Sequence, residues 1–272
     1  MKAAQISAFQ NYILRWYALH GRTELPWRQT QDPYKILVSE LMLQQTQVQR
    51  VIPKYSNFLR QFPDIQTLAE SSLANVLAHW QGLGYNRRAK FLWQTAQKVT
   101  VAFDGRFPKT KEALQTLPGI GPYTASAVSV FAFNNPETVI ETNIRTIFLY
   151  HFFPNTSEIS DAQILPLITE TRYTKNPREW YAALMDYGSY LKKIVPNPSR
   201  KSKHHTTQSR FEGSPRQVRG EIIRYLTKSG SLNEKNLQAK IKGNKNHYPQ
   251  ALQDLLKEGM ITQSNAIISL MK

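Results

Sequence analysis

The sequence has no cysteine among its 272 residues. This absence excludes disulfide bonds, thiol nucleophiles and every zinc or iron–sulfur site that is built from thiolate ligands. The sequence also lacks any apolar run that approaches the length of a membrane-spanning helix, and its first residues, Met-Lys-Ala-Ala-Gln, contain no signal-peptide core. We therefore expect a soluble, intracellular protein with no cofactor, no metal site and no membrane partner.

Acidic residues are scarce. The chain has 19 Asp and Glu against 35 Lys and Arg, which gives a formal net charge of +16 and a pI near 9.9. A surplus of this size favours a polyanionic partner, with nucleic acid ahead of an anionic membrane surface. Hydrophobic residues make up 41% of the chain, which is enough for the core of one large domain or of a main domain with a smaller one.

Apolar residues recur at helical spacing through most of the chain, and the breaks fall at prolines, glycines and polar clusters. No convincing strand-like alternation occurs before residue 255, so the body is predicted to be all-α. Asp32 is the expected N-cap of the second helix. The predicted helices cover residues 4–21, 36–47, 49–61, 66–71, 73–80, 86–102, 110–117, 122–133, 143–153, 161–170 and 177–193.

A basic, polar stretch from Lys192 to Arg219 follows and contains little that could form a core. We predict a linker over residues 192–213. Its adjacent histidines, His204 and His205, have no carboxylate or second histidine pair at ligand spacing, so a solvated basic loop is favoured over a metal site. The sequence of residues 214–272 predicts three short helices and a hairpin around Ser264-Asn265. This order resembles a winged helix; a small helical cap without nucleic-acid contacts is the alternative.

A tight glycine turn joins two of the predicted helices, in the stretch Leu-Pro-Gly-Ile-Gly-Pro-Tyr-Thr-Ala-Ser-Ala-Val (117–128). Pro122 suits the first position of the second helix, because its missing N–H is not needed there. Gly119 and Gly121 leave the backbone N–H groups at that helix N-terminus clear of side chains, an arrangement that binds phosphate. The spacing predicts a phosphate-binding helix-hairpin-helix, with an ordinary helix-to-helix turn as the alternative.

Two glutamates are candidates for acid–base chemistry. Glu40 lies among apolar neighbours on a predicted helix, where burial favours the protonated form of a carboxyl group and makes it a proton donor. Glu141 follows the apolar run Thr-Val-Ile and precedes a helix, whose dipole favours the ionised form. One protonated and one ionised carboxyl group are the pair that cleaves glycosidic bonds through an oxocarbenium-like transition state. A plain surface charge is the alternative for each.

Residues 25–190 resemble the helix-hairpin-helix (HhH-GPD) DNA glycosylase superfamily, and within it the MutY-type adenine DNA glycosylases. The motifs that carry the resemblance are Leu-Pro-Trp-Arg (25–28), Asp-Pro-Tyr-Lys (32–35), Ser-Glu-Leu-Met-Leu-Gln-Gln-Thr-Gln-Val (39–48), Gly-Leu-Gly-Tyr (82–85), Leu-Pro-Gly-Ile-Gly-Pro-Tyr-Thr-Ala (117–125) and Met-Asp-Tyr-Gly (185–188). The resemblance implies a two-lobed helical glycosylase domain in residues 1–191. A six-helix lobe would cover about 25–133, and a second lobe would combine 1–24 with 136–191.

The resemblance also implies roles for particular residues. Glu40 matches the catalytic glutamate, which protonates the adenine leaving group and handles the water. Tyr123 matches the tyrosine of monofunctional members, where the endonuclease III branch has a Schiff-base lysine, and so favours base removal without strand cleavage. Asn143 matches an active-site asparagine, and Trp27 and Arg28 match residues of the adenine pocket. Gln44 and Gln45 match the pair beside the gap in the DNA helix that the flipped base leaves. Gly119 and Gly121 match the phosphate-binding hairpin.

Four departures from the family pattern bear on the substrate. Glu141 stands where the family has a catalytic aspartate; the extra methylene moves the carboxylate by about 1 Å, a misplacement that can lower a rate roughly 100-fold. The four cluster cysteines expected after Met-Asp-Tyr-Gly are absent, and cluster-free relatives exist. Asn86 replaces the second tyrosine of Gly-Leu-Gly-Tyr-Tyr that wedges beside 8-oxoguanine. The Nudix-like C-terminal domain does not fit in the remaining residues.

We therefore expect a monofunctional glycosylase for adenine opposite 8-oxoguanine or guanine. Its partner would be double-stranded DNA with a mispaired or damaged base, contacted by Asn86 among others, and the enzyme would act as a monomer in the cytoplasm or nucleoid. Thymine or uracil opposite guanine is the alternative within the same fold, since Asn86 and Glu141 leave room for another base. A non-catalytic DNA-binding protein and a lyase that uses Lys192 or Lys193 are the alternatives of other classes.

Overall fold

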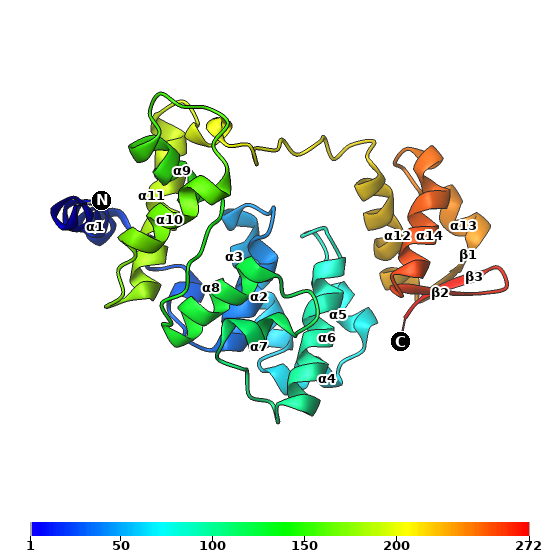
Figure 1. Cartoon of the computed structure of the whole chain (residues 1–272). Coiled ribbons are helices and arrows are strands. Elements are labelled where there is room, and N and C mark those ends of the chain that lie inside the picture. Colours follow the sequence, from blue (N-terminus) through cyan, green and yellow to red (C-terminus); the bar gives the residue numbers. More distant parts are fainter. Residues whose placement is uncertain (1, 272) are drawn as a thin grey trace. The chain divides into compact units, whose positions relative to one another are not determined.

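The computed structural model describes residues 2–271, and the chain forms two compact units. Unit 1 comprises Met1–Ile36, Lys109–Thr116 and Ile120–Thr207, and unit 2 comprises Leu37–Pro108, Leu117–Gly119 and Gln208–Lys272. Helices dominate the described residues, and three short strands lie near the carboxyl end (Figure 1). This composition confirms the predicted all-α body with a small α+β part.

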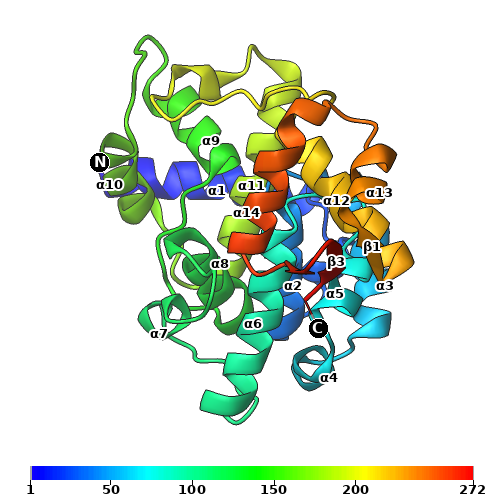
Figure 2. The same ribbon diagram turned by 90° about the vertical axis from the view of Figure 1, so that its right-hand side faces the viewer.

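Phe9, which is half-buried, belongs to an aromatic cluster of unit 1. The helices of unit 1 are α1 (Ala3–His20), η1 (Pro26–Arg28), α7 (Lys111–Gln115), α8 (Pro122–Phe133), α9 (Thr142–Phe152), α10 (Asp161–Thr171), α11 (Pro177–Ile194) and η2 (Pro198–Lys201). Phe9 meets Phe148, Phe152 and Trp180 edge-on, with ring centres 5.3–5.9 Å apart, and each such pair adds about 0.5–1.5 kcal/mol beyond burial. Phe148 and Phe152 belong to α9 and Trp180 to α11, so these rings attach α1 to both helices. Figure 2 shows α1 passing beside α11.

The first part of unit 2 packs around Phe58. The ring centre of Phe58 lies 4.8 Å from that of Phe62 and 5.8 Å from that of Trp80, and all three side chains are fully buried. The helices around this core are α2 (Pro33–Leu43), which enters unit 2 at Leu37, α3 (Val48–Gln61), α4 (Ile65–Glu70), α5 (Leu73–His79) and α6 (Arg87–Ala102).

Short polar side chains set where several helices begin. Asp64, Ser72 and Thr110 each accept a hydrogen bond from the backbone N–H three residues further on, at the starts of α4, α5 and α7, and so satisfy an N–H that the helix leaves unpaired. Asp32 acts in the same way at α2, where its Oδ1 accepts from the N–H of Tyr34 at 2.9 Å. The predicted N-cap at Asp32 is therefore confirmed.

One predicted helix end is wrong. α2 stops at Leu43 instead of continuing to Gln47, because Gln45 adopts a left-handed backbone with φ of 54°, which a right-handed helix cannot contain. Gln44 and Gln45 therefore lie in the turn between α2 and α3.

The carboxyl-terminal part of unit 2 combines helices with a small antiparallel sheet (Figure 1). Its elements are α12 (Pro215–Ser229), β1 (Ser231–Asn233), α13 (Glu234–Lys240), η3 (Lys245–His247), α14 (Tyr248–Lys257), β2 (Ile261–Ser264) and β3 (Ile267–Leu270). The strand order is β1-β3-β2, with Ile268 opposite Leu232 on one side and Gln263 on the other. The predicted hairpin is present. Sequence analysis misses β1, since three residues are too few to show an alternating pattern.

Polar contacts attach this part to α5 and α6. Gln81 Nε2 donates to Thr227 Oγ1 at 3.3 Å, and Lys90 Nζ donates to the carbonyl oxygen of Gly259 at 3.3 Å and to that of Glu258. The ammonium group of Lys90 therefore lies at the carboxyl end of α14, where a cation is favoured by the exposed carbonyl groups.

The stretch expected to contain little core is partly packed against unit 1. Pro198, Ser199 and Ser202 are buried, and the backbone of Ile159 donates to Lys201 O at 2.9 Å and accepts from Lys203 N at 3.0 Å. Backbone pairing and small side chains bury this segment, so apolar patterning gives no sign of it. Residues 203–213 are exposed, as expected. The domain boundaries at 191, 213 and 214 stay a prediction.

Within residues 2–271, no helix combines the length and apolarity needed to cross a membrane.

α11 approaches the first turn of α9 at Gly188. A Cβ at this position would lie 2.9 Å from the Cβ of Asn143 and closer still to its backbone carbonyl, well inside van der Waals contact. Two turns earlier, the hydroxyl of Tyr181 accepts a hydrogen bond from the N–H of Val139 at 3.2 Å. One face of α11 thus holds residues 139–143 in place, and it can do so only because Gly188 has no side chain.

We expect Gly188→Ala to lower the free energy of unfolding by about 1–3 kcal/mol, because the new methyl group must push α11 away from α9. Gly220 in α12 provides a matched control, since a Cβ there meets nothing within 4 Å; Gly220→Ala should stabilise the protein by about 0.5–1 kcal/mol through helix propensity. Thermal unfolding followed by circular dichroism measures both. The same effect from both substitutions would contradict the close approach at Gly188.

Candidate active site

Glu40 lies on α2 with 7% of its surface exposed, beside Leu37 and Leu41, which are 1% and 2% exposed. The predicted burial of Glu40 is therefore confirmed. Ser39, the preceding residue, is also buried, so this turn of α2 carries two polar side chains into the protein interior.

Arg88, on α6, holds the carboxyl end of α2 in place. Its Nη1 donates to the carbonyl oxygens of Leu41 (2.7 Å), Met42 (3.1 Å) and Gln44 (2.6 Å), and its Nη2 donates to those of Leu83 (3.1 Å) and Gly84 (3.0 Å). Burial lowers the pKa of Arg88 to about 10, which still leaves the guanidinium charged at neutral pH. A single buried fork thus satisfies five carbonyl groups and ties the turn after α2 to the loop before α6.

The tips of these two loops meet the carboxyl-terminal part of unit 2. Gln45 and Tyr85 both have a positive φ, of 54° and 48°. Gln208 Nε2 donates to the hydroxyl of Tyr85 at 2.6 Å and to Oε1 of Gln45 at 3.4 Å. Arg216 donates to the same hydroxyl at 2.7 Å, with its guanidinium carbon 5.6 Å from the ring centre. Asn86 begins α6 without making a side-chain capping bond.

The structure requires glycine at one of the two glycine positions of the predicted hairpin and leaves space for a side chain at the other. Gly119 has a φ of 71°, and a Cβ there would lie 2.5 Å from Phe91 Cβ, so both backbone and packing require glycine. Gly121 is the N-cap of α8, with Pro122 at the first helical position as predicted, and a Cβ on Gly121 would meet nothing within 4 Å. Tyr123 lies in the first turn of α8 and is half-buried.

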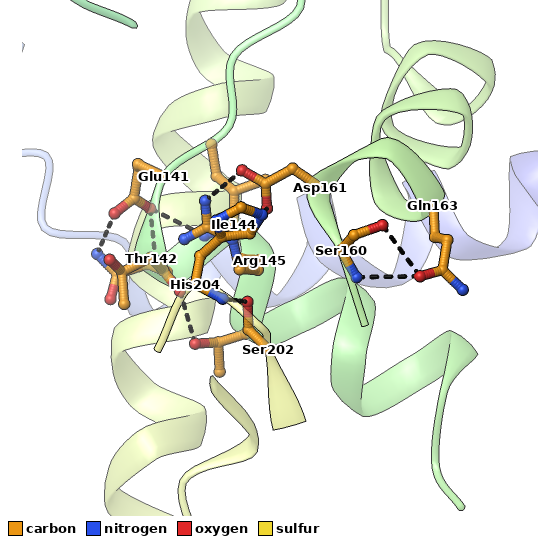
Figure 3. A network of polar contacts seen from close by, with 11 residues as sticks. Glu141, Thr142, Ile144, Arg145, Ser160, Asp161, Gln163, Ser202 and His204 are labelled. Carbon is orange, nitrogen blue, oxygen red and sulfur yellow. Dashed lines mark hydrogen bonds and ion pairs between the residues drawn. The ribbon is translucent and has the colours of Figure 1, made fainter. Parts of the chain in front are cut away.

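Glu141 is the N-cap of α9 (Figure 3). One carboxylate oxygen accepts hydrogen bonds from the backbone N–H groups of Asn143 (2.7 Å) and Ile144 (2.8 Å), and the other accepts from the side-chain amide of Asn143 at 3.2 Å. The structure therefore brings together two of the predicted catalytic residues and fixes the carboxylate with three donors. This contact is close in sequence, and the predicted position of Glu141 at a helix start is the signal that anticipates it.

Desolvation of the carboxyl group raises the pKa of Glu141, while the hydrogen bonds from Asn143 and Ile144 and the charges of Lys192 and Arg145 act in the opposite direction. Arg145 itself is engaged in a two-point ion pair with Asp161, at 2.7 and 2.8 Å (Figure 3), which lowers the pKa of Asp161. The hydrogen bonds and the nearby positive charges thus favour the ionised form of Glu141, and desolvation favours the protonated form.

Trp27 and Arg28 form η1 in unit 1, and Trp27 is 7% exposed. The guanidinium carbon of Arg28 lies 5.3 Å from the ring centre of Phe131, and its Nη2 lies 3.6 Å from Oδ1 of Asp186, a carboxylate that Arg22 also binds at 2.6 Å. Nε and Nη1 of Arg28 are buried without a hydrogen-bond partner. A cavity of about 600 Å³ within unit 1 reaches Arg28, a volume suited to a small ligand.

The residues that follow Met-Asp-Tyr-Gly do not fit the iron–sulfur cluster of the family. The sequence offers no thiolate, and Lys201 of η2 donates to the carbonyl oxygens of Phe153 (3.2 Å) and Pro154 at the carboxyl end of α9. Between residues 2 and 271, no group of three or more histidine and carboxylate side chains is arranged to hold a metal ion. No step of the chemistry is therefore assigned to a cluster or metal.

The predicted site residues fall into two sets. Unit 2 contains Glu40, Gln44, Gln45, Asn86 and Gly119, and unit 1 contains Trp27, Arg28, Gly121, Tyr123, Glu141 and Asn143. Sequence analysis misses Arg88 and Asp186, which bind Gln44 and Arg28. A charged residue at a helical position that the hydrophobic pattern assigns to the core could have indicated both, because a buried charge requires partners.

Comparisons with known proteins identify the family. Residues 38–169 match the HhH-GPD superfamily of base excision DNA repair proteins. The adenine DNA glycosylase of Mycolicibacterium smegmatis is 30% identical over 284 aligned positions, which cover 93% of this chain and 92% of that protein. The chain belongs to the adenine DNA glycosylase family. Its matched region includes Glu40, the glycine hairpin and Glu141.

Other adenine DNA glycosylases match over shorter regions. That of Buchnera aphidicola subsp. Baizongia pistaciae is 38% identical over 187 residues, or 67% of this chain and 52% of that protein, so the chain spans about half the length of this relative. A solved thermostable thymine-DNA glycosylase aligns with a TM-score of 0.62 at 23% identity, covering 72% of this chain and 91% of that one. An endonuclease III structure aligns at 0.55 and 16% identity. These two structures confirm the glycosylase fold.

We expect Arg88→Lys to lower the free energy of unfolding by about 2–4 kcal/mol, because an ammonium group has three donors for five carbonyl groups and leaves buried acceptors unpaired. Arg87→Lys is the control, since the side chain of Arg87 is 60% exposed and lies 3.8 Å from Glu258; exposed pairs contribute about 0–1 kcal/mol. Denaturant titration measures both. If Arg88→Lys lowered the free energy of unfolding no more than Arg87→Lys does, the hydrogen bonds of Arg88 would not be central to the stability of this region.

Proposed function

We propose that this adenine DNA glycosylase family member hydrolyses the N-glycosidic bond of adenine mispaired with 8-oxoguanine or guanine and leaves the DNA strand intact. The observation that carries the proposal is the cradle of Glu141, in which three hydrogen bonds hold a carboxylate at the start of α9. A fixed, desolvated carboxylate stabilises the positive charge that develops on the sugar as the glycosidic bond breaks. Similarity over nearly the whole M. smegmatis adenine DNA glycosylase supports adenine as the base.

In the proposed reaction the C1′–N9 bond of an extruded adenosine breaks and water adds to C1′. Glu40 donates the proton that leaves with adenine and takes one from the water, so it returns to its starting state. Trp27 and Arg28 are the residues that would bind the base, as the family likeness implies. Tyr123 cannot form a Schiff base, which supports release without strand cleavage.

The DNA contacts are assigned by the same family likeness. Gln44, Gln45 and Asn86 would contact the duplex around the extruded base, and Gly119 and Gly121 would bind a phosphate at the hairpin. The net charge of +16 supports a polyanionic partner. The chain would act as a monomer in the cytoplasm or nucleoid, with glycosylase chemistry in residues 1–191, and needs no cofactor, because side chains supply both the proton and the stabilising charge.

Single-turnover incubation with end-labelled duplexes tests this proposal. The duplexes carry A opposite 8-oxoguanine, A opposite G, T opposite G and U opposite G, each divided into alkali-treated and untreated halves. We expect alkali-dependent cleavage at adenine. Glu40→Gln should lower the rate at least about 100-fold by removing the proton donor, and Glu141→Gln should lower it by about 100-fold or more by removing the charge. Glu141→Asp should release base faster than Glu141→Gln, because aspartate also caps a helix and remains charged.

Glu24→Gln is the control. Glu24 is exposed in the loop before η1, so this substitution should leave the rate of base release unchanged. Cleavage at T or U would reassign the base, the outcome that Asn86 and Glu141 leave open. Cleavage without alkali, together with a DNA adduct trapped by borohydride, would indicate a lyase. Selective binding of damaged duplex with no base release by the parent or any variant would indicate a DNA-binding protein without catalysis.

A further inference from the structure

The face of α11 that touches α9 continues beyond Gly188 to Lys192. The two residues are four apart and so share one face of the helix. Helical side chains lean towards the N-terminus of their helix, and a residue therefore covers the turn before its own Cα. The turn before Lys192 is that of Gly188, which has no side chain and touches Asn143. Lys192 thus lies on the face of α11 that meets the start of α9, and it is half-buried while Lys193 is exposed.

Each element around Glu141 contributes charged groups. Arg145 on α9 is paired with Asp161 of α10, and Nε2 of His204, from the segment after η2, lies 3.9 Å from the same Asp161 carboxylate (Figure 3). α11 contributes Lys192. The charge of Arg145 is offset by Asp161 at contact distance, whereas Lys192 forms no ion pair within 4.0 Å with any described residue. The charge of Lys192 is thus not offset by a contacting carboxylate, and it favours the ionised form of Glu141 across the contact between α9 and α11.

We infer that Lys192 is a positioning residue for the proposed reaction, whose ammonium group keeps the carboxyl group of Glu141 ionised. The inference rests on the proposed function for its catalytic consequence, and on the geometry of α9 and α11 for the interaction itself. The charges influence one another in both directions. Lys192 opposes the rise that burial causes in the pKa of Glu141, and Glu141 opposes the fall that burial causes in the pKa of Lys192.

The sign of the effect follows from the charges. Removing the positive charge makes the carboxylate less stable relative to the carboxylic acid, so the pKa of Glu141 rises further. Base release requires the ionised carboxylate of Glu141. The rate of base release therefore falls as the pH falls through the pKa of Glu141. A neutral residue at position 192 must therefore move the acid limb of the rate to higher pH without a comparable change on the alkaline side.

The test measures single-turnover base release against pH for the parent, Lys192→Gln, Lys192→Arg and Lys193→Gln. We expect Lys192→Gln to move the acid midpoint up by about 0.5–1 pH unit, as removal of a nearby opposite charge does. Lys192→Arg should restore the parent profile because it keeps the charge, and exposed Lys193→Gln should leave it unchanged. His204→Gln is a further control, since Nε2 of His204 lies 3.9 Å from the Asp161 carboxylate; the acid limb of the rate profile should persist in this variant.

A second readout does not depend on activity. The titration of Glu141 is followed by carboxyl carbon NMR in glutamate-labelled protein, with Glu141→Gln assigning the signal, and melting temperatures confirm that each variant is folded. Lys192→Gln should raise the Glu141 midpoint by the same amount as in the rate profile. An unchanged midpoint in Lys192→Gln, or an equal shift in Lys193→Gln, would overturn the inference. A shifted midpoint in a protein that releases no base from any duplex would uphold it and overturn the proposed function instead.

Discussion

The approach of α11 to the first turn of α9 is the contact on which the chemistry of unit 1 depends. Gly188 admits the backbone of Asn143 at a distance that no side chain allows, and this places the start of α9 beside the face of α11 that carries Tyr181 and Lys192. The carboxylate of Glu141 then serves two purposes. It satisfies the N–H groups that the first turn leaves unpaired, and it carries a negative charge where the proposed reaction needs one. Stability and chemistry use the same atoms.

Arg88 solves a related problem in unit 2. The carboxyl end of α2 leaves carbonyl groups without helical partners, and those of the buried residues Leu41 and Met42 need donors from the protein itself. The guanidinium group supplies five donors in a rigid plane. Glu40 lies one turn before this fork, and Gln44 lies within it. The positions of the proposed proton donor and of the predicted DNA contacts therefore depend on a cation that takes no part in the chemistry.

Local signals in the sequence predicted much of this structure. The helix starts at Asp32 and Pro122, the burial of Glu40 and the hairpin near the carboxyl end all follow from caps, proline placement and hydrophobic period, each of which acts within a few residues. The end of α2 could not be predicted in this way, because the left-handed residue at Gln45 is stabilised by groups far away in the sequence. The same holds for Arg88, Asp186 and Lys192. The groups that they act on lie in segments distant in the sequence, so the spacing of residues along the chain does not predict these interactions.

The interleaved division of the chain has a consequence for synthesis on the ribosome. α1 is made before its partners, because the aromatic residues that contact Phe9 lie on α9 and α11, roughly 140–170 residues later, or about 7–35 s at 5–20 residues per second. The helices α2–α6 of the other unit emerge during this interval and can pack among themselves. α1 therefore leaves the ribosome well before the residues that bury it, and its apolar face stays open to water while α2–α6 fold.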